Sequence, residues 1–161
     1  MQVRLINLAS ALRVDLLFNP EIQQGSTNTG YSGWPQITEM KKKRIYVADD
    51  DANILELMQM ILEAKGYEVI TSADGRSLAR LQELPDMVFL DIAMSGSDGS
   101  EICYDYKQEG KSGDRPVVLV SANTNLHEIA NRCGADDVLA KPFDIKAVVD
   151  LARKYTEKGN N

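Results

Sequence analysis

The sequence is poor in the residues that build disulfide frameworks, zinc sites and histidine chemistry. It has two cysteines and one histidine in 161 residues. Cys103 and Cys133 are too few and too isolated for a disulfide framework or a zinc site, so we expect both to be small buried side chains in a reducing cytoplasm. One histidine gives no kinase core, and we expect His127 to lie on the surface of a helix.

Positive charge and long apolar runs are also scarce. Lys and Arg number 18 against 24 Asp and Glu, which gives a formal net charge of -6. Sequence-independent nucleic-acid binding needs a basic surface that replaces the counterions on the phosphates, so this balance predicts a protein partner or a cation instead. No apolar run approaches the roughly 18 residues that a membrane-spanning helix needs, so no membrane partner is expected.

The first 39 residues differ in composition from the rest. Their apolar positions lack a sustained period, and the stretch 18–39 is rich in Gly, Ser, Thr, Asn and Gln, with Pro20 and Pro35. Such composition is typical of a linker. We therefore predict a flexible N-terminal extension or linker at 1–39 and one domain with a core of ordinary size at 40–161, entered through the solvated KKKR run.

From residue 44 onward, short apolar runs alternate with stretches of helical periodicity. The runs predict strands at 44–48, 67–71, 87–91, 116–120 and 136–140. The periodic stretches predict helices at 52–65, 74–83, 98–109, 126–133 and 144–158. Asp51 and Asp144 stand where a carboxylate favours a helix start. Strict alternation of this kind predicts an α/β fold, in which right-handed crossovers join a parallel sheet that helices cover on both faces.

The strand that ends in Asp91 is the one around which the rest is organised. The residues before it, from Met87 to Leu90, are all apolar, which suits a parallel strand buried on both faces. In open α/β sheets the chemistry lies just beyond the carboxyl ends of such strands. A strand also ends in Asp simply because a short polar side chain suits a turn, and this stretch alone gives the two interpretations similar weight.

Four of the five predicted strands deliver polar side chains at the same edge of the sheet. These are Asp49 and Asp50 after the first strand, Asp91 after the third, Ser121 after the fourth and Lys141 after the fifth. Three carboxylates held close together repel one another unless a cation lies among them, and oxygen ligands without Cys or His suit Mg²⁺. A metal, a hydroxyl and a lysine around one further carboxylate make a site for a phosphoryl group, with that carboxylate as the nucleophile.

Four segments of the chain resemble, in order, the signature segments of the receiver domain of bacterial response regulators. They are IYVADDDANI, PDMVFLDIAMSGSDG, PVVLVSA and GADDVLAKPFD, and the resemblance covers about residues 41–158. It implies the flavodoxin-like, doubly wound, five-stranded parallel sheet of order 2-1-3-4-5 with five helices. It also implies a cytoplasmic member of a two-component or phosphorelay system. Such a protein receives its phosphoryl group from a phosphohistidine on a sensor histidine kinase or a histidine phosphotransfer protein, and it signals to a downstream target protein.

By the same resemblance Asp91 is the phospho-acceptor of a protein that is not a turnover enzyme but catalyses its own phosphorylation and slow dephosphorylation. With Mg²⁺ as the cofactor, the implied metal ligands are Asp49, Asp50, Asp91 and the backbone carbonyl of Ala93. The residues implied to contact the phosphoryl oxygens are Ser121 and Lys141. The Lys141–Pro142 bond is implied to be cis.

Three features depart from the family pattern. Ser95 stands where a proline is usual after the aspartate, which predicts a looser loop. Ala93 and Asn123 occupy positions that, in this family, tune how fast the acyl phosphate hydrolyses, so the resemblance does not imply its lifetime. Val138 replaces the aromatic residue that usually reports phosphorylation to the surface near the last helix, so we expect only a modest change at that surface.

Two other classes of function remain as alternatives. A pseudo-receiver that binds partners without being phosphorylated would usually have lost part of the Asp, Ser and Lys set, whereas this chain keeps all of it. An aspartyl-phosphate hydrolase of the haloacid dehalogenase kind has a second Asp two residues after the nucleophile, where this chain has Ala93. A flavin-binding protein of the same fold ranks lower, because no Ser- and Thr-rich phosphate loop follows the first strand. Since the chain ends near the last predicted helix, we expect a stand-alone receiver without an output domain.

Overall fold

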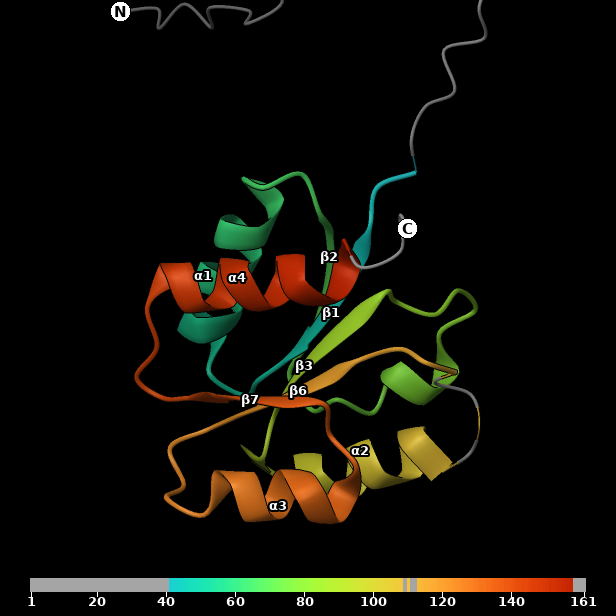
Figure 1. Cartoon of the computed structure of the whole chain (residues 1–161), viewed down its shortest axis with the longest axis vertical. Helices are drawn as coiled ribbons and strands as arrows, with labels where there is room; N and C mark the ends of the chain where they lie inside the picture. Colours follow the sequence, from blue (N-terminus) through green and yellow to red (C-terminus); the bar gives the residue numbers. More distant parts are fainter. Residues whose placement is uncertain (1–40, 109, 111–112, 158–161) are drawn as a thin grey trace, which may run out of the picture. The chain divides into compact units, whose positions relative to one another are not determined.

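A computed structural model of the chain describes residues 41–108, 110 and 113–157. Five strands form one parallel sheet in the order β2-β1-β3-β6-β7, which confirms the predicted topology (Figure 1). Their bounds are β1 (Arg44–Ala48), β2 (Glu68–Ser72), β3 (Met87–Asp91), β6 (Val117–Ser121) and β7 (Asp137–Ala140). The extension predicted at 1–39 lies outside the described residues.

Among the residues that the structure describes, four α-helices cover the two faces of this sheet. They are α1 (Ala52–Glu63), α2 (Gly99–Gln108), α3 (Leu126–Cys133) and α4 (Ile145–Thr156). The helices α1 and α4 lie on one face, and α2 and α3 lie on the other (Figure 1). Within the described part of the chain, we find no helix with the length and apolar character needed to cross a bilayer.

Strand β3 is buried on both faces, as its unbroken apolar run predicts. All five of its residues are buried. Met87 and Phe89 belong to the core cluster under α1 and α4, whereas Val88 and Leu90 belong to the cluster under α2 and α3. Because side chains alternate between the faces of a strand, a central strand between two helix layers needs apolar residues on both faces, and in β3 only Asp91 at the carboxyl end departs from this pattern.

The α-helix predicted at 74–83 is wrong. This segment contains only the single 3-10 turn η2 (Leu78–Arg80). Side-chain hydrogen bonds turn the chain as it leaves β2: the Ser72 hydroxyl accepts the Gly75 N–H at 3.1 Å, and the Asp74 carboxylate accepts the Arg76 N–H at 3.0 Å. Gly75 has a φ of +69°, outside the helical range. Local side-chain acceptors and a left-handed glycine thus compete successfully with a short helix.

Carboxylates cap two of the helices, as predicted. The side chain of Asp51 accepts the Asn53 N–H at 2.9 Å at the start of α1. The side chain of Asp144 accepts the Ala147 N–H at 2.7 Å at the start of α4. Each bond satisfies an amide that has no partner within its own helix, so Asp51 is assigned to the helix and not to the site next to it.

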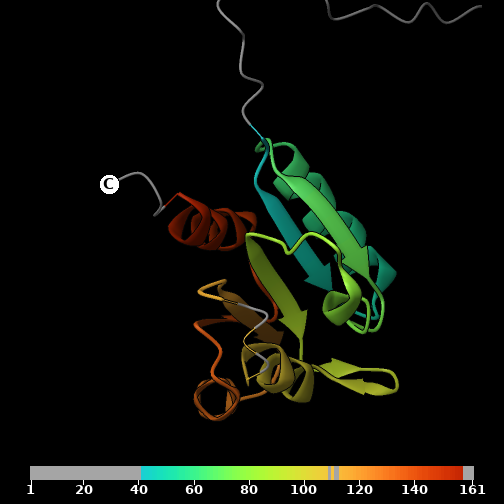
Figure 2. The same cartoon turned by 90° about the vertical axis from the view of Figure 1, so that its right-hand side faces the viewer.

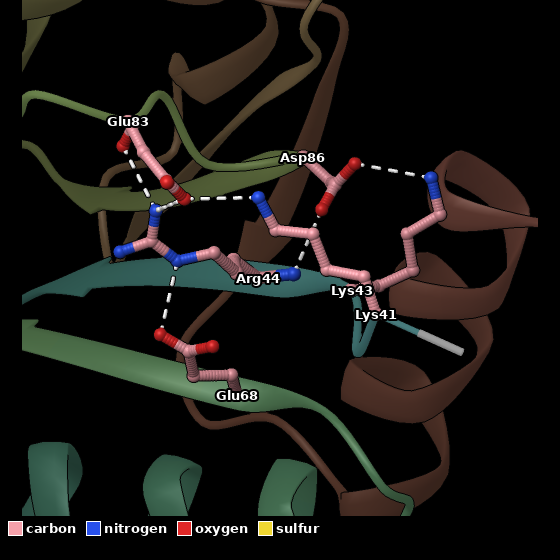
Figure 3. Close-up of polar contacts among 6 residues, drawn as sticks. All are labelled: Lys41, Lys43, Arg44, Glu68, Glu83 and Asp86. Carbon is pink, nitrogen blue, oxygen red and sulfur yellow. Dashed lines mark hydrogen bonds and ion pairs between the residues drawn. The ribbon is translucent and has the colours of Figure 1, made fainter. Parts of the chain in front are cut away.

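A network of ion pairs lies at the amino ends of the strands (Figure 3). Arg44 joins Glu68 on β2 at 3.0 Å and Glu83 at 3.1 Å. The other pairs are Lys41–Glu83 and Lys43–Asp86. Because most of these groups are exposed, each pair contributes at most about 1 kcal/mol. The KKKR run is therefore a solvated strand entrance, on the edge away from the aspartates that follow β1 and end β3.

Candidate functional site

The carboxyl edge of the sheet brings together residues that are far apart in the sequence. Asp91 is the last residue of β3, and Ser121 is the last residue of β6. Asp49 follows β1 directly, and Lys141 follows β7 directly. The parallel register pairs Leu90 with Ala48, Asp91 with Val120 and Ser121 with Ala140, so these strands end within about one residue of one another at this edge.

Three of these side chains are almost completely buried. The exposed fractions of the residues are 1% for Asp49, 4% for Asp91 and 3% for Ser121. In the described ranges the only other buried polar or charged residue is Thr156. Burying a carboxylate is costly unless it is paired, so this concentration of buried polar groups indicates a site that is kept for its chemistry.

Lys141 is the cation that faces both buried carboxylates. Its Nζ donates to Asp49 Oδ2 at 2.6 Å and lies 3.3 Å from Asp91 Oδ1. Burial raises the pKa of Asp91, and the charge of Asp49 adds to this effect, although Lys141 opposes it. Burial also lowers the pKa of Lys141, but the bond to Asp49 and the charges of both carboxylates outweigh it, so the net shift is upward. Lys141 is therefore held as an ammonium beside Asp91.

The carboxylates of Asp49, Asp50 and Asp91 form a cluster that fits a metal ion. One oxygen from each lies within 4.8 Å of the others. Asp50 is exposed, so the cluster opens to solvent on its side. Together with the Lys141 ammonium, the three carboxylates carry a formal charge of -2, which a divalent cation balances. The donor set consists of hard oxygens alone, and this is the ligand chemistry of Mg²⁺ or Ca²⁺.

A short hairpin borders this cluster. Strands β4 (Ala93–Met94) and β5 (Ser97–Asp98) pair antiparallel across a two-residue turn beside α2 (Figure 2). In the turn, Ser95 donates to Asp50 Oδ2 from its amide at 2.9 Å and from its hydroxyl at 2.8 Å. These two bonds are the main reason why the pKa of Asp50 is lowered. The loop is thus tied to the site, and the prediction that Ser95 loosens it is wrong.

Two further contacts at this edge were missed by the sequence analysis. Arg76 Nη2 donates to the carbonyl of Gly96 at 2.5 Å, so the segment after β2 holds the hairpin turn from the other side. Gly99 donates its N–H to the carbonyl of Ile92 at 2.9 Å, so the first residue of α2 lies against the backbone just after β3. Gly99 follows the turn residues in the sequence, but no local pattern shows that it needs to be a glycine.

Ser121, the Lys141–Pro142 bond and Val138 complete the set of residues that the sequence singled out. The Ser121 hydroxyl accepts the Asn123 N–H at 3.2 Å, and its backbone carbonyl accepts the Lys141 N–H at 2.8 Å. The Lys141–Pro142 bond is cis, as predicted. Val138 on β7 is half-buried and packs against the core under α2 and α3.

The histidine and the two cysteines do not belong to the cluster of polar side chains at the carboxyl edge of the sheet. His127 is exposed on α3, as predicted. Cys103 and Cys133 are free and buried, also as predicted, and burial strongly raises the pKa of the Cys103 thiol. A thiol in that state is a hydrophobic side chain and not a nucleophile.

The chain matches known proteins over the described domain. The family model described as response regulator receiver domain matches residues 45–153. Among curated relatives, ycf27 of Cyanophora paradoxa is 33% identical over 130 residues, and the DNA-binding response regulator MtrA of Mycobacterium tuberculosis is 34% identical over 124. These matches cover 76% and 74% of this chain and 52% and 53% of the relatives, so the chain spans about half their length. The solved receiver domain of NtrX from Brucella abortus superposes with a TM-score of 0.63 at 34% identity, covering 71% of this chain and 99% of that structure.

Proposed function

The chain belongs to the response regulator receiver domain family, and from this premise we propose that it accepts a phosphoryl group on Asp91 with Mg²⁺ as the cofactor. The observation that carries the proposal is the surroundings of Asp91. Its carboxylate is buried at the end of β3, 3.3 Å from the Lys141 ammonium and within 4.8 Å of oxygens from Asp49 and Asp50. A lone acidic side chain at a turn would have no reason to be buried among other charges.

The proposed reaction transfers the phosphoryl group from a phosphohistidine. An oxygen of Asp91 attacks the phosphorus, the phosphorus–nitrogen bond breaks, and the electron pair leaves with the imidazole of the donor. Lys141, already in contact with Asp91, neutralises charge on the transferring oxygens. The Ser121 hydroxyl donates a hydrogen bond to the attached group.

The residues that would hold Mg²⁺ are Asp49, Asp50, Asp91 and the backbone carbonyl of Ala93. When bound, the ion supplies positive charge to the phosphoryl oxygens. The two buried carboxylates and the exposed Asp50 fit this role because they supply oxygen donors and leave one side for water and phosphate, as Mg²⁺ requires.

An apolar groove beside Lys141 supports a protein as the phosphoryl donor. The groove has a volume of about 390 Å³ and is lined by Ile54, Leu57, Ala122, Lys141, Pro142 and Phe143. Leu57 is 41% exposed, and on the same helix Met60 is 63% exposed. A sensor histidine kinase or a histidine phosphotransfer protein fits such a surface, because it has to bring its phosphohistidine to Asp91. Because the matches cover only about half of MtrA and ycf27, we propose this function for the receiver domain and propose no nucleic-acid contact for it.

Direct phosphorylation tests this proposal. Incubation with acetyl phosphate and Mg²⁺, followed by intact mass analysis, should show one added phosphoryl group that is absent when EDTA replaces Mg²⁺. A protein that stays unlabelled while binding Mg²⁺ would be a pseudo-receiver. Sustained release of inorganic phosphate at a rate far above that of a slow acyl-phosphate hydrolysis would favour the hydrolase.

Metal binding should depend strongly on Asp50. We expect Asp50→Ala to weaken Mg²⁺ binding by about tenfold or more and to slow phosphorylation in proportion, because the variant loses one ligand charge. Isothermal titration with Mg²⁺ measures the effect. The neighbouring Asp51→Asn is the matched control, because asparagine also caps α1 and the metal cluster is left intact. If both variants bind Mg²⁺ like the parent, Asp50 is not a ligand.

The response to phosphorylation should concentrate near the site. Val138 is short and stiff at χ1, so it cannot make the swing that an aromatic side chain makes when Ser121 moves toward the phosphoryl group. We expect amide chemical shifts to change most at 91–98 and 121–126 when beryllofluoride is added, and less along β7 and α4. Equally large changes at Val138 and along α4 would show that this face switches without an aromatic residue.

A further inference from the structure

In the turn of the β4–β5 hairpin, Ser95 makes two hydrogen bonds to one carboxylate oxygen of Asp50, a proposed metal ligand. Both donors of Ser95, its amide and its hydroxyl, point at the same atom, Asp50 Oδ2, at 2.9 and 2.8 Å. A carboxylate oxygen has two lone-pair positions, and here two donors take them. Oδ1 accepts no bond from Ser95, so it is the oxygen of Asp50 left for a cation.

Divalent cations differ in the number and geometry of the carboxylate oxygens that they bind. Ca²⁺ takes 6–8 oxygens in flexible geometry and often binds both oxygens of one carboxylate, whereas Mg²⁺ takes six in near-ideal octahedral geometry and uses single oxygens and water. We propose that Ser95 makes this site selective for Mg²⁺ over Ca²⁺, because it restricts Asp50 to coordination through one oxygen. The inference rests on the metal site of the proposed function and adds the residue that sets its specificity.

The hairpin strengthens this restriction by fixing two ligands together. Ala93, whose carbonyl is the fourth proposed ligand, lies on β4 and pairs with Asp98 on β5. Ser95, two residues later, bonds to Asp50, and Arg76 holds Gly96 in the same turn. Asp50 and the Ala93 carbonyl are therefore kept in one geometry, which suits the small octahedral ion and disfavours a larger ion that needs an adaptable shell.

Calorimetric titration of the unphosphorylated protein with MgCl₂ and with CaCl₂ tests the proposal without any phosphoryl transfer. The measured quantity is the Kd for Ca²⁺ divided by the Kd for Mg²⁺. We expect Ser95→Ala, which keeps the backbone bond but loses the hydroxyl, to lower this ratio by about threefold, and Ser95→Pro, which loses both donors, to lower it by about tenfold. Ser95→Thr keeps both donors and should keep the ratio of the parent.

Ser97→Ala is the matched control in the same hairpin. The Ser97 hydroxyl is buried and has no hydrogen-bond partner in the described part of the chain, so its loss should leave the ratio unchanged. If Ser95→Ala and Ser95→Pro bind both ions with the ratio of the parent, the selectivity proposal is overturned while the metal site stands. If the parent binds neither ion, the metal site and the selectivity proposal both fail, and the phosphorylation assay still decides the role of Asp91. If Ser95→Pro does not fold, Ser95→Ala and Ser95→Thr decide the question.

Discussion

Asp91→Asn is expected to take up no phosphoryl group from acetyl phosphate and Mg²⁺, and to be at least as stable as the parent. Uptake is lost because the amide has no nucleophilic carboxylate oxygen. Stability is kept because the pKa of Asp91 is raised by burial, with Asp49 as a further cause. A raised pKa means that the ionised carboxylate is less favourable in the folded chain than in the unfolded chain, so at pH 7 its charge lowers the free energy of unfolding, whereas a neutral amide of similar shape does not.

Two measurements on the same variant separate chemistry from folding. Intact mass analysis should show no added phosphoryl group, and the Tm in the absence of metal should equal or exceed that of the parent. Lys141 keeps its 2.6 Å bond to Asp49, so the substitution leaves it paired. Asp105→Asn, an exposed carboxylate on α2, is the control and should be labelled normally. Labelling of Asp91→Asn would place the acceptor elsewhere, and a large fall in its Tm would attribute the loss to unfolding.

The strands could be predicted because a buried strand shows in the sequence as a short run of consecutive apolar residues. The run from Met87 to Leu90 has no polar position, and a strand that contacts helices on both faces tolerates none. The order of the strands came from the family resemblance and is confirmed by the sheet. The aspartates and the lysine at the strand ends could be placed on one edge because parallel strands end together.

The helix at 74–83 could not be predicted correctly from periodicity. Its apolar residues suit a helix, but the turn that replaces the first part of the helix depends on the Ser72 hydroxyl and the Asp74 carboxylate finding backbone amides. Leu78 is buried in the resulting 3-10 turn, and Leu81 and Leu84 pack against the same core, so the segment is anchored without a full helix. Short segments of this kind are decided by such local bonds and by tertiary packing more than by propensity.

The role of Ser95 could not be predicted because its partner is distant. Ser95 and Asp50 are 45 positions apart, and the bond forms only when the hairpin is placed beside β1. The sequence did carry a signal, since a serine offers an N–H and an O–H that a proline lacks. Whether Ser95 loosens or fixes the loop could be predicted only by knowing that the Asp50 carboxylate lies within hydrogen-bonding distance of these donors.

Gly99 lies in close contact with the backbone at the end of β3. A Cβ at this position would lie 1.9 Å from the carbonyl oxygen of Asp91, 2.8 Å from its carbonyl carbon and 3.0 Å from the Cα of Ile92. All three neighbours are backbone atoms, so no side chain can rotate away. Any larger residue must move either the start of α2 or the end of β3, which carries the proposed phospho-acceptor.

We therefore expect Gly99→Ala to destabilise the domain by about 3 kcal/mol or more, as severe overpacking does, and to lower the Tm by roughly 10 °C. Phosphorylation by acetyl phosphate should be lost or strongly slowed in the fraction that stays folded, because Asp91 moves relative to Lys141. Thermal denaturation and intact mass analysis measure the two effects. Gly66→Ala is the matched control: a Cβ there meets nothing within 4 Å, although the φ of +90° strains an alanine, so we expect a cost of only about 1 to 2 kcal/mol and normal phosphorylation. If Gly99→Ala melts within a few degrees of the parent and is labelled normally, the contact between α2 and the end of β3 is looser than the geometry requires.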